Sequence, residues 1–420
     1  MWSKASVRSR MLLSTSMVHF MNHITLYAFP SIVIFIRDDI PLSYSEIGLI
    51  AAIPTLLMVT LTPIVGRTRI GLESWVILSG LFVMGASLVL MAMAGNILDL
   101  AISSVILGIG GAAYHPPGFS MVSTFFEERK GEALALNQGA GIIATGLAPF
   151  LLVGASSLIG WQETLILCGG ATISIIPLGA ILLVGVGDAL RSLNSKYPIP
   201  QLDTGNSFPG RSSSILVAVI SLPLIIALIL SACRSTVFRI VTFFTVTLMN
   251  DFYGLSKEES GVISSIILLL GVMSEFLGGR ISDRMKEGRG KVLFVSAIGM
   301  VILSALLALL GQEVPWLIGI TIYLLFICSY FFAASNFIAL LAEMVPPHLR
   351  TAAFGLNFSI GQLAGALAPI IFGYLLDTYG FVAGMLYLVF VSVSALFVIV
   401  ILNRMMIKAQ NSNAKSLPAT

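Results

Sequence analysis

Long apolar runs, separated by short polar or Gly/Pro-containing breaks, dominate the chain. Ser74–Ala94 and Gly380–Leu402, for example, contain no charged residue. A helix of about 20 residues crosses a hydrocarbon core about 30 Å thick, because each residue adds about 1.5 Å. Strands of a membrane barrel would instead alternate in polarity over about 10 residues, and no such pattern occurs in this sequence. The pattern predicts an all-α membrane protein.

The apolar runs resolve into twelve predicted transmembrane helices. Their approximate limits are 10–36, 44–66, 72–94, 97–122, 131–154, 162–186, 214–249, 256–280, 290–311, 315–344, 350–376 and 380–403. An even number places both termini on one side of the membrane, and most lysines and arginines fall on that side. The opposite loops hold only Arg37 and Lys257. Because basic residues mark cytoplasmic loops, we predict cytoplasmic termini.

The second half of the chain repeats the first half. Residues 42–50 resemble residues 255–263 at an offset of 213. At an offset of 220, the matches include Asn137 with Asn357, Gly141 with Gly361, and Leu147–Pro149 with Leu367–Pro369. Six spans separate the copies, so both halves have the same orientation. Some transporter folds consist of such parallel repeats.

This repeat divides the chain into four predicted parts. They are an N-terminal six-helix bundle (1–186), a cytoplasmic linker (187–213), a C-terminal six-helix bundle (214–403) and a cytoplasmic tail (404–420). The linker is rich in proline, glycine and serine, which favours a flexible tether over a third folded domain.

Composition narrows the class of protein further. The chain is 57% hydrophobic and 10% charged, whereas soluble domains carry roughly a quarter charged residues. The net charge of +3 gives no reason to expect a nucleic-acid partner. The three cysteines lie inside apolar runs, so neither a disulfide framework nor a metal knuckle is predicted. The first apolar run lacks a small-residue cleavage pattern, and we expect a span rather than a signal peptide.

One loop carries a family resemblance. Gly278-Gly-Arg-Ile-Ser-Asp-Arg284 resembles the cytoplasmic loop signature of the major facilitator superfamily, and the twelve-span repeat is similar to that family over almost the whole chain. The resemblance implies a gating loop in which Gly279, Asp283 and Arg284 tie helices together in one access state. An ordinary basic loop is the alternative. The matching segment of the first half, residues 66–71, lacks the acidic residue, so we assign gating only to the second half.

A second resemblance concerns the first and fourth spans. Ala112-Ala-Tyr-His-Pro-Pro-Gly118 and His19-Phe-Met-Asn22 resemble the fosmidomycin-resistance branch of drug exporters, although His23 stands where that branch has an acidic residue. Pro116 and Pro117 predict a break in the fourth helix, because proline removes backbone hydrogen bonds.

Polar side chains inside spans are the candidate functional residues, because they are costly in a membrane. His19, Asn22 and His23 share one face of the first helix at i, i+3 and i+4, and His115 lies at similar depth on the fourth. Members of the resembled family line a central cavity with the first, fourth, seventh and tenth helices. The resemblance therefore implies that these residues face solute.

The second half offers Arg234 on the seventh span and Asn336 on the tenth. Arg234 lies roughly 24 Å below the outer loop, too deep to reach the surface easily. It could line the cavity, or it could be an interhelical hydrogen-bond donor. Arg239 is about 140° away around the helix, and we leave it open between cavity lining and a structural pairing.

These residues predict a secondary active transporter that uses alternating access. Arg234 and Asn336, with Asn22, His115 and His19, would bind a small anionic or zwitterionic solute, because arginine pairs with carboxylates and phosphates.

Protons are the expected coupling ion. His19, His23 and His115 would carry them, since the ordinary pKa of histidine, about 6.5, is close to physiological pH. Three histidines could also hold zinc, but no cysteine or carboxylate joins them, and we predict neither a metal nor a cofactor.

The resemblance favours proton-coupled efflux, by a monomer, across the plasma membrane. The alternatives are an uptake symporter or uniporter for organic anions such as carboxylates, and a non-transporting membrane sensor. We see no catalytic constellation in the sequence and do not expect an enzyme.

Overall fold

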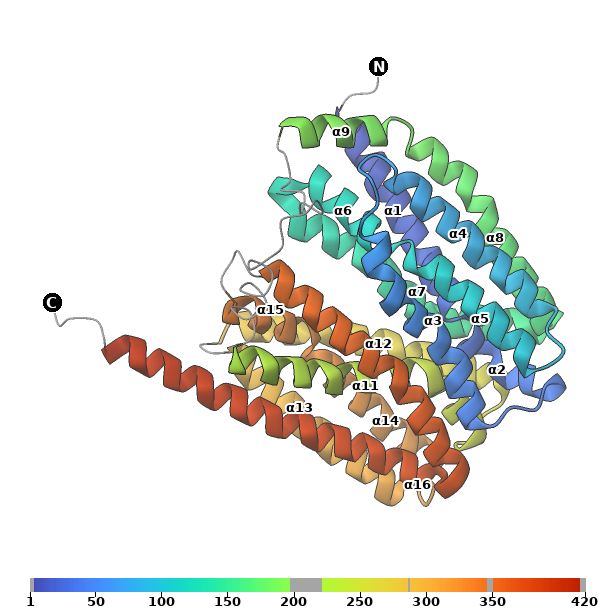
Figure 1. The fold of residues 1–420 in the computed structure, drawn as a ribbon. Coiled ribbons are helices and arrows are strands. Elements are labelled where there is room, and N and C mark those ends of the chain that lie inside the picture. The colour runs from blue at the N-terminus through green and yellow to red at the C-terminus, as the bar shows by residue number, and fades with distance from the viewer. Residues whose placement is uncertain (1–3, 197–220, 286–287, 346–349, 416–420) are drawn as a thin grey trace. The chain divides into compact units, whose positions relative to one another are not determined.

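The computed structural model describes residues 4–196, 221–285, 288–345 and 350–415 (Figure 1). Throughout these ranges the chain is helical, without strands. Residues 197–213 of the predicted linker and residues 416–420 of the predicted tail lie outside the described part. The all-α prediction is confirmed.

Eleven stretches of the described chain are long and apolar enough to cross a membrane. The last of them, Ala353–Met405, has 53 residues, which is far longer than the roughly 20 residues one crossing needs. Gly380 interrupts it with a φ of 77°, a left-handed conformation that glycine adopts without steric cost. Its two parts are separate spans, so twelve spans are present, as predicted.

The helices of the first half are α1 (Lys4–Leu26), α2 (Ala28–Asp39), α3 (Tyr44–Val65), α4 (Glu73–Ala92), α5 (Ile97–Ala112), α6 (His115–Phe125), α7 (Lys130–Ile159), α8 (Trp161–Leu182) and α9 (Val186–Lys196). Those of the second half are α11 (Leu222–Asp251), α12 (Lys257–Asp283), α13 (Gly288–Leu310), α14 (Trp316–Phe332), α15 (Ala334–Met344) and α16 (Arg350–Lys415). The first span consists of α1 and α2, the fourth of α5 and α6, and the tenth of α14 and α15.

The repeat is visible in how two of these helices begin. Before α3, Ser43 and Glu46 form a capping box, in which each side chain accepts a hydrogen bond from the other residue's backbone N–H. Ser256 and Glu259 make the same two bonds before α12, at 2.8 and 3.2 Å. Such a box satisfies two amide donors that a helix start would otherwise leave unpaired. The offset of 213 therefore marks equivalent helix starts.

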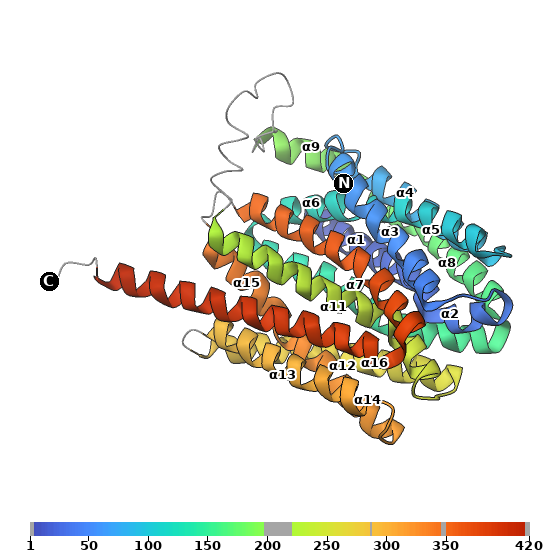
Figure 2. The ribbon, with the colours of Figure 1, turned by 60° about the horizontal axis from the view of Figure 1, so that its bottom comes forward.

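Two compact units form the chain. Unit 1 comprises Met1–Ser207 and Thr242–Ile266, and unit 2 comprises Phe208–Val241 and Ile267–Thr420. The boundary thus falls inside α11 and α12, because the ends of these two helices contact first-half residues. In unit 1, α4 packs against α5 and α8; in unit 2, α13 runs along α16 in both views (Figures 1 and 2).

Small residues bring the helices close together. A Cβ on Gly85 of α4 would lie 2.8 Å from the carbonyl oxygen of Gly169 on α8, and one on Gly169 would lie 2.5 Å from that of Gly85. Reciprocal glycines of this kind are typical of packing between membrane helices. Large apolar side chains instead lie on the outside, among them Trp75 at 71% and Phe390 at 68% exposure, as expected for surfaces that face lipid.

The start of the predicted linker is a helix rather than a tether. Val186 and Leu190 of α9 are buried in a core with Ile77 of α4 and Val122 of α6. Because Val186 and Leu190 are four residues apart, they share one helix face. An amphipathic helix thus covers this end of unit 1 and includes residues 187–196 of the predicted linker.

Candidate functional site

The fourth span breaks where the prolines predicted. α5 ends at Ala112, and α6 begins at His115 with proline in its first turn. Proline suits the start of a helix because the amide it lacks would have no partner there. His115 is therefore the first residue of a new helix, in the middle of a span.

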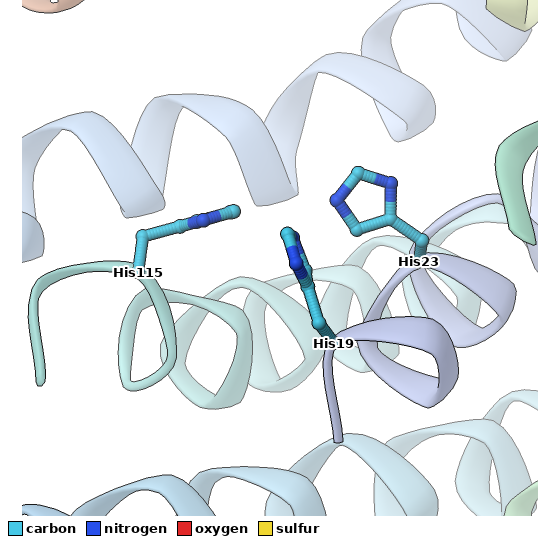
Figure 3. Close-up of side chains that lie close together, drawn as sticks. All are labelled: His19, His23 and His115. Atoms are coloured by element: carbon cyan, nitrogen blue, oxygen red, sulfur yellow. The ribbon is translucent and has the colours of Figure 1, made fainter. Parts of the chain in front are cut away.

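His115 lies beside two histidines of α1. The ring of His19 is between those of His115 and His23 (Figure 3), with ring centroids 5.4 and 4.8 Å away. One nitrogen of each ring lies within 4.8 Å of the corresponding nitrogens of the other two. The structure thus brings together the three histidines that the sequence singled out.

Hydrogen bonds determine which nitrogen of His19 carries the proton. Nδ1 of His19 lies 2.9 Å from the backbone oxygen of Asn137. A carbonyl oxygen only accepts, so Nδ1 must be the donor, and in the neutral ring Nε2 is then a bare lone pair. This Nε2 is buried and has no hydrogen-bond partner in the described part of the chain.

His23 adopts the same tautomer for a related reason. Its Nδ1 lies 2.8 Å from Oγ1 of Thr145, and that hydroxyl donates its proton to the carbonyl of Gly141 at 3.0 Å. The hydroxyl oxygen must therefore accept from His23. A Cβ on Gly141 would lie 2.8 Å from Nε2 of His19 and 3.0 Å from Nε2 of His23, so both Nε2 atoms approach the same point on α7.

A buried tyrosine holds the cluster in place. The hydroxyl of Tyr114 donates to the backbone oxygen of Thr15 at 2.8 Å and contacts the amide of Asn137. The Tyr114 ring stacks on His19, with a centroid distance of 4.5 Å. Asn22 points elsewhere: it is buried and donates to the sulfur of Met84 on α4 at 3.1 Å. Asn22 therefore lies on the predicted face, but its amide bonds to α4.

Unit 2 repeats this construction with smaller side chains. A Cβ on Gly361 of α16 would lie 2.8 Å from Oγ of Ser231 and 2.7 Å from Oγ of Ser235. Ser231 also donates to the backbone oxygen of Asn357 at 3.2 Å. Gly361 and Asn357 are the repeat partners of Gly141 and Asn137, so the two serines of α11 stand where unit 1 has His19 and His23.

The smaller side chains leave a cavity of about 190 Å³ in unit 2. It is lined by Ser231, Ser235, Phe238, Arg239, Tyr330, Asn357, Phe358, Gly361 and Gln362. Arg239 is the one lining residue with a formal charge, and it donates to Oε1 of Gln362 at 2.8 Å. The cavity therefore combines one cation with hydroxyl and amide groups.

Arg234 and Asn336 lie elsewhere in unit 2. Arg234 is buried, donates to the backbone oxygen of Tyr330 at 3.2 Å, and has its guanidinium 4.7 Å from the Tyr330 ring centre. Its charge also interacts with Glu275. Asn336 is 3% exposed and donates to the backbone oxygen of Phe332 at 3.4 Å. These contacts match the interhelical role that the sequence left open for Arg234.

The residues of the predicted gating loop lie at the end of α12. A Cβ on Gly278 would be 2.8 Å from the carbonyl carbon of Phe332 and closer still to its oxygen, whereas one on Gly279 would be 3.5 Å from Oγ of Ser335. Asp283 and Arg284 are exposed. Glycine at 278 thus permits a close approach of α12 to the backbone at Phe332, and the gating role of Gly279, Asp283 and Arg284 stays a prediction.

Ion pairs join the two halves of the sequence within unit 1. Arg37 of α2 pairs with Asp251 at the end of α11, and Lys257 of α12 pairs with Asp38. The hydroxyl of Tyr44 donates to Asp251 at 2.9 Å. The two basic residues that stood alone in the loops opposite the termini are therefore both paired.

The sequence analysis assigned solute binding to Arg234 and left Arg239 open, but it could not determine which of the two arginines of α11 lines a cavity. Arg239 lines the cavity and Arg234 does not appear among the residues that line it. The repeat held one usable signal, the match of Gly141 with Gly361, because Gly361 lines the cavity. Gln362 follows that glycine directly and could have been found from it.

Comparison with known proteins agrees with this architecture. The chain is 25% identical over 350 residues to the probable nitrate transporter NarT of Staphylococcus epidermidis, covering 82% of this chain and 84% of the relative. It is 23% identical over 378 residues to the fosmidomycin resistance protein of Escherichia coli, covering 88% of each. The crystal structure of a D-xylose–proton symporter has a TM-score of 0.74 at 14% identity, covering 94% of this chain and 96% of that chain.

A family profile, described as the Major Facilitator Superfamily, matches residues 15–369. That match extends over most of the chain and includes the three histidines, the cavity of unit 2 and the gating loop. Together with the twelve helices and the parallel repeat, it shows that the chain belongs to the Major Facilitator Superfamily of membrane transporters.

Proposed function

We propose that this protein is a proton-coupled secondary transporter that exports a small anionic solute, and that Arg239 rather than Arg234 binds the anion. The observation that carries the proposal is the cavity of about 190 Å³ in unit 2 with Arg239 on its wall. A guanidinium offers several N–H donors in one plane, which suits the oxygens of a carboxylate, nitrate or phosphonate.

The size of the cavity supports a small solute. Pockets for drug-sized ligands usually enclose about 300–1,000 Å³, more than this cavity holds. Its hydroxyl and amide groups, from Ser231, Ser235, Asn357 and Gln362, can hydrogen-bond the solute on sides that Arg239 does not reach. An inorganic anion or a short organic acid fits these features better than a bulky apolar compound.

A larger hollow in unit 1 supports the proposal less well. It has a volume of about 400 Å³ and is lined by α4, α8 and α9, including Trp75, Asp188 and Arg191. Arg191 already pairs with Asp188 at 2.5 Å, so an anion would have to displace a carboxylate. No carboxylate is among the residues that line the cavity around Arg239.

The histidines of unit 1 would supply proton coupling. His19, His23 and His115 are the buried or half-buried histidines of the described chain, and histidine is the side chain whose charge changes most readily near neutral pH. Their separation from Arg239 along the chain allows one group to carry protons while another binds the solute.

The names of the relatives are consistent with this chemistry. Nitrate is an anion, and resistance to fosmidomycin agrees with the export that the histidine motif suggested. We place the protein in the plasma membrane as a monomer. We assign both termini to the cytoplasm because basic residues are concentrated on the side of the termini.

Thermal stabilisation of purified protein by solutes tests the anion site. A panel of nitrate, a short carboxylate, a sulfonate, a phosphonate and a neutral sugar should raise the unfolding temperature only for anions, because a ligand that binds the folded state stabilises it. Arg239→Gln should abolish the effect, and Gln362→Glu should do the same by placing a carboxylate beside the guanidinium. Arg404→Gln removes the same charge from an exposed position and should leave the effect intact.

Flux into or out of proteoliposomes then tests direction and coupling. An outward solute flux driven by an inward proton gradient is expected, with a pH dependence that His115→Ala removes. Stabilisation by the neutral sugar alone, or by anions in Arg239→Gln, would contradict the anion site. An unchanged pH dependence in His115→Ala would contradict the coupling role.

A further inference from the structure

Two histidine Nε2 atoms of unit 1 lie close to the same point. His19 and His23 both use Nδ1 as a donor, to the backbone oxygen of Asn137 and to the hydroxyl of Thr145. In the neutral rings Nε2 is then the atom that can accept or ligate, and both Nε2 atoms lie near the Cβ position of Gly141. The Nε2 of His19 is buried without a hydrogen-bond partner among the described residues, and a buried acceptor without a donor is costly.

The pattern of hydrogen bonds is the one that metal-binding histidines show. A histidine that ligates a metal almost always donates its other ring N–H to a carbonyl, carboxylate or water, which fixes the tautomer and the ring orientation. His19 meets this description with a backbone carbonyl, and His23 meets it with a hydroxyl that is itself oriented by the carbonyl of Gly141.

A third histidine completes the set. His115 lies on the other side of His19 (Figure 3), and the ligand nitrogens of all three lie within 4.8 Å of one another. In a tetrahedral zinc shell, nitrogens about 2.0–2.1 Å from the metal are about 3.4 Å apart. From 4.8 Å the nitrogens need to close by little more than an ångström, a movement that rotation about side-chain bonds can provide.

From this geometry we propose that His19, His23 and His115 form a binding site for a divalent transition-metal ion, with a fourth position for water or an anion. Neutral imidazoles favour zinc, copper, nickel and iron over magnesium or calcium. Three histidines with one open position are also a known zinc arrangement. The proposal does not depend on which solute the protein transports, but a metal ion and the coupling protons would compete for the same three rings.

Binding should tie two segments together. His19 and His23 belong to α1, whereas His115 is the first residue of α6, immediately after the break in the fourth span. An ion held by all three would link α1 to α6 across that break. It would therefore raise the thermal stability of the protein as well as being detectable directly.

Titration of the purified full-length protein, with any affinity tag removed, tests the site. Calorimetry with Zn²⁺ should show one ion per chain, and Co²⁺ should give a visible absorption spectrum typical of nitrogen ligands. His19→Ala and His115→Ala should each weaken binding by about 100-fold or more, because each removes a ligand, and loss of an outer-shell partner alone typically costs 10–100-fold. The fourth histidine of the chain, His348, lies outside the described residues, and His348→Ala should not change the affinity.

Gly141→Ala tests the geometry without removing a ligand. The added methyl group would lie 2.8 Å from Nε2 of His19 and 3.0 Å from Nε2 of His23, so both rings must move away from the shared position. We expect a loss of about tenfold or more in affinity, comparable with disturbing the outer shell of a metal site. Gly139→Ala, two residues earlier on α7, meets nothing within 4 Å and should bind metal as the parent does.

The outcomes separate the alternatives. Stoichiometric binding that is lost in the histidine variants and in Gly141→Ala, but kept in Gly139→Ala and His348→Ala, supports the site. Absence of binding by folded, monodisperse parent protein overturns it. Binding that survives His19→Ala and His115→Ala overturns it as well, because the ion would then lie elsewhere. None of these results alters the test of Arg239 with anions.

Discussion

Replacing Gly278 by alanine should separate α12 from the break in the tenth span. The new Cβ would lie 2.8 Å from the carbonyl carbon of Phe332 and closer still to its oxygen. Real Cβ atoms essentially never approach heavy atoms within 3.0 Å. The obstacle is backbone rather than a flexible side chain, so a rotamer change cannot relieve the overpacking. The helices must therefore move apart by about 1 Å.

The cost can be estimated from two opposing effects. Overpacking typically costs about 1–3 kcal/mol, and a rigid obstacle places Gly278→Ala at the upper end. Alanine in place of glycine stabilises a helix by about 1 kcal/mol, which leaves a net destabilisation of about 2 kcal/mol. Gly279→Ala meets its nearest atom, Oγ of Ser335, at 3.5 Å, and should be neutral or slightly stabilising. The two neighbouring variants should therefore differ by about 2–3 kcal/mol.

Thermal unfolding of the purified variants in detergent measures this difference. Because large proteins often unfold irreversibly, the midpoints must be compared at one heating rate. We expect the midpoint of Gly278→Ala to fall about 5 °C or more below that of Gly279→Ala. A functional loss should accompany it, since the Phe332 carbonyl also accepts the Asn336 amide. Equal midpoints for the two variants would refute the close approach of α12 to the Phe332 carbonyl.

Two further predictions concern the ion pairs and the buried tyrosine of unit 1. Arg37→Asp should slow solute flux in proteoliposomes, because it places a second carboxylate beside Asp251. The double variant Arg37→Asp with Asp251→Arg should restore the flux. A double variant as slow as the single one would contradict the pairing. Tyr114→Phe should destabilise the protein by about 1–3 kcal/mol, because the hydroxyl bonded to Thr15 is lost from a buried site. The same change at Tyr379, which is 67% exposed, should leave the unfolding midpoint unchanged.

Several features of the protein followed from the sequence because they depend on solvent or on local chemistry. Hydrocarbon cannot hydrogen-bond the backbone, so long uncharged runs must be helices, and twelve of them are present. Pro116 and Pro117 break the fourth span because the proline ring conflicts with a continuing helix. Ser43 and Ser256 begin equivalent helices because each forms a capping box with the glutamate three residues later.

Breaks without a local cause were not foreseen. The tenth span ends one helix at Phe332 and begins another at Ala334, although no proline lies between them. Its repeat partner in the fourth span has two prolines at the corresponding place. The packing of Gly278 against the Phe332 carbonyl accompanies this break, and such a contact between distant segments leaves no mark in the local sequence.

The chemistry of the site divides in the same way. The sequence by itself determined that three histidines lie within the first and fourth spans and that α11 carries two arginines. It also determined that Gly141 has a counterpart in Gly361. Only the tertiary structure decided that Arg239 lines the cavity and that His19 and His23 share one tautomer. The physical reason is that helix rotation and hydrogen-bond direction depend on the partners that packing supplies, and those partners are more than 100 residues away in the chain.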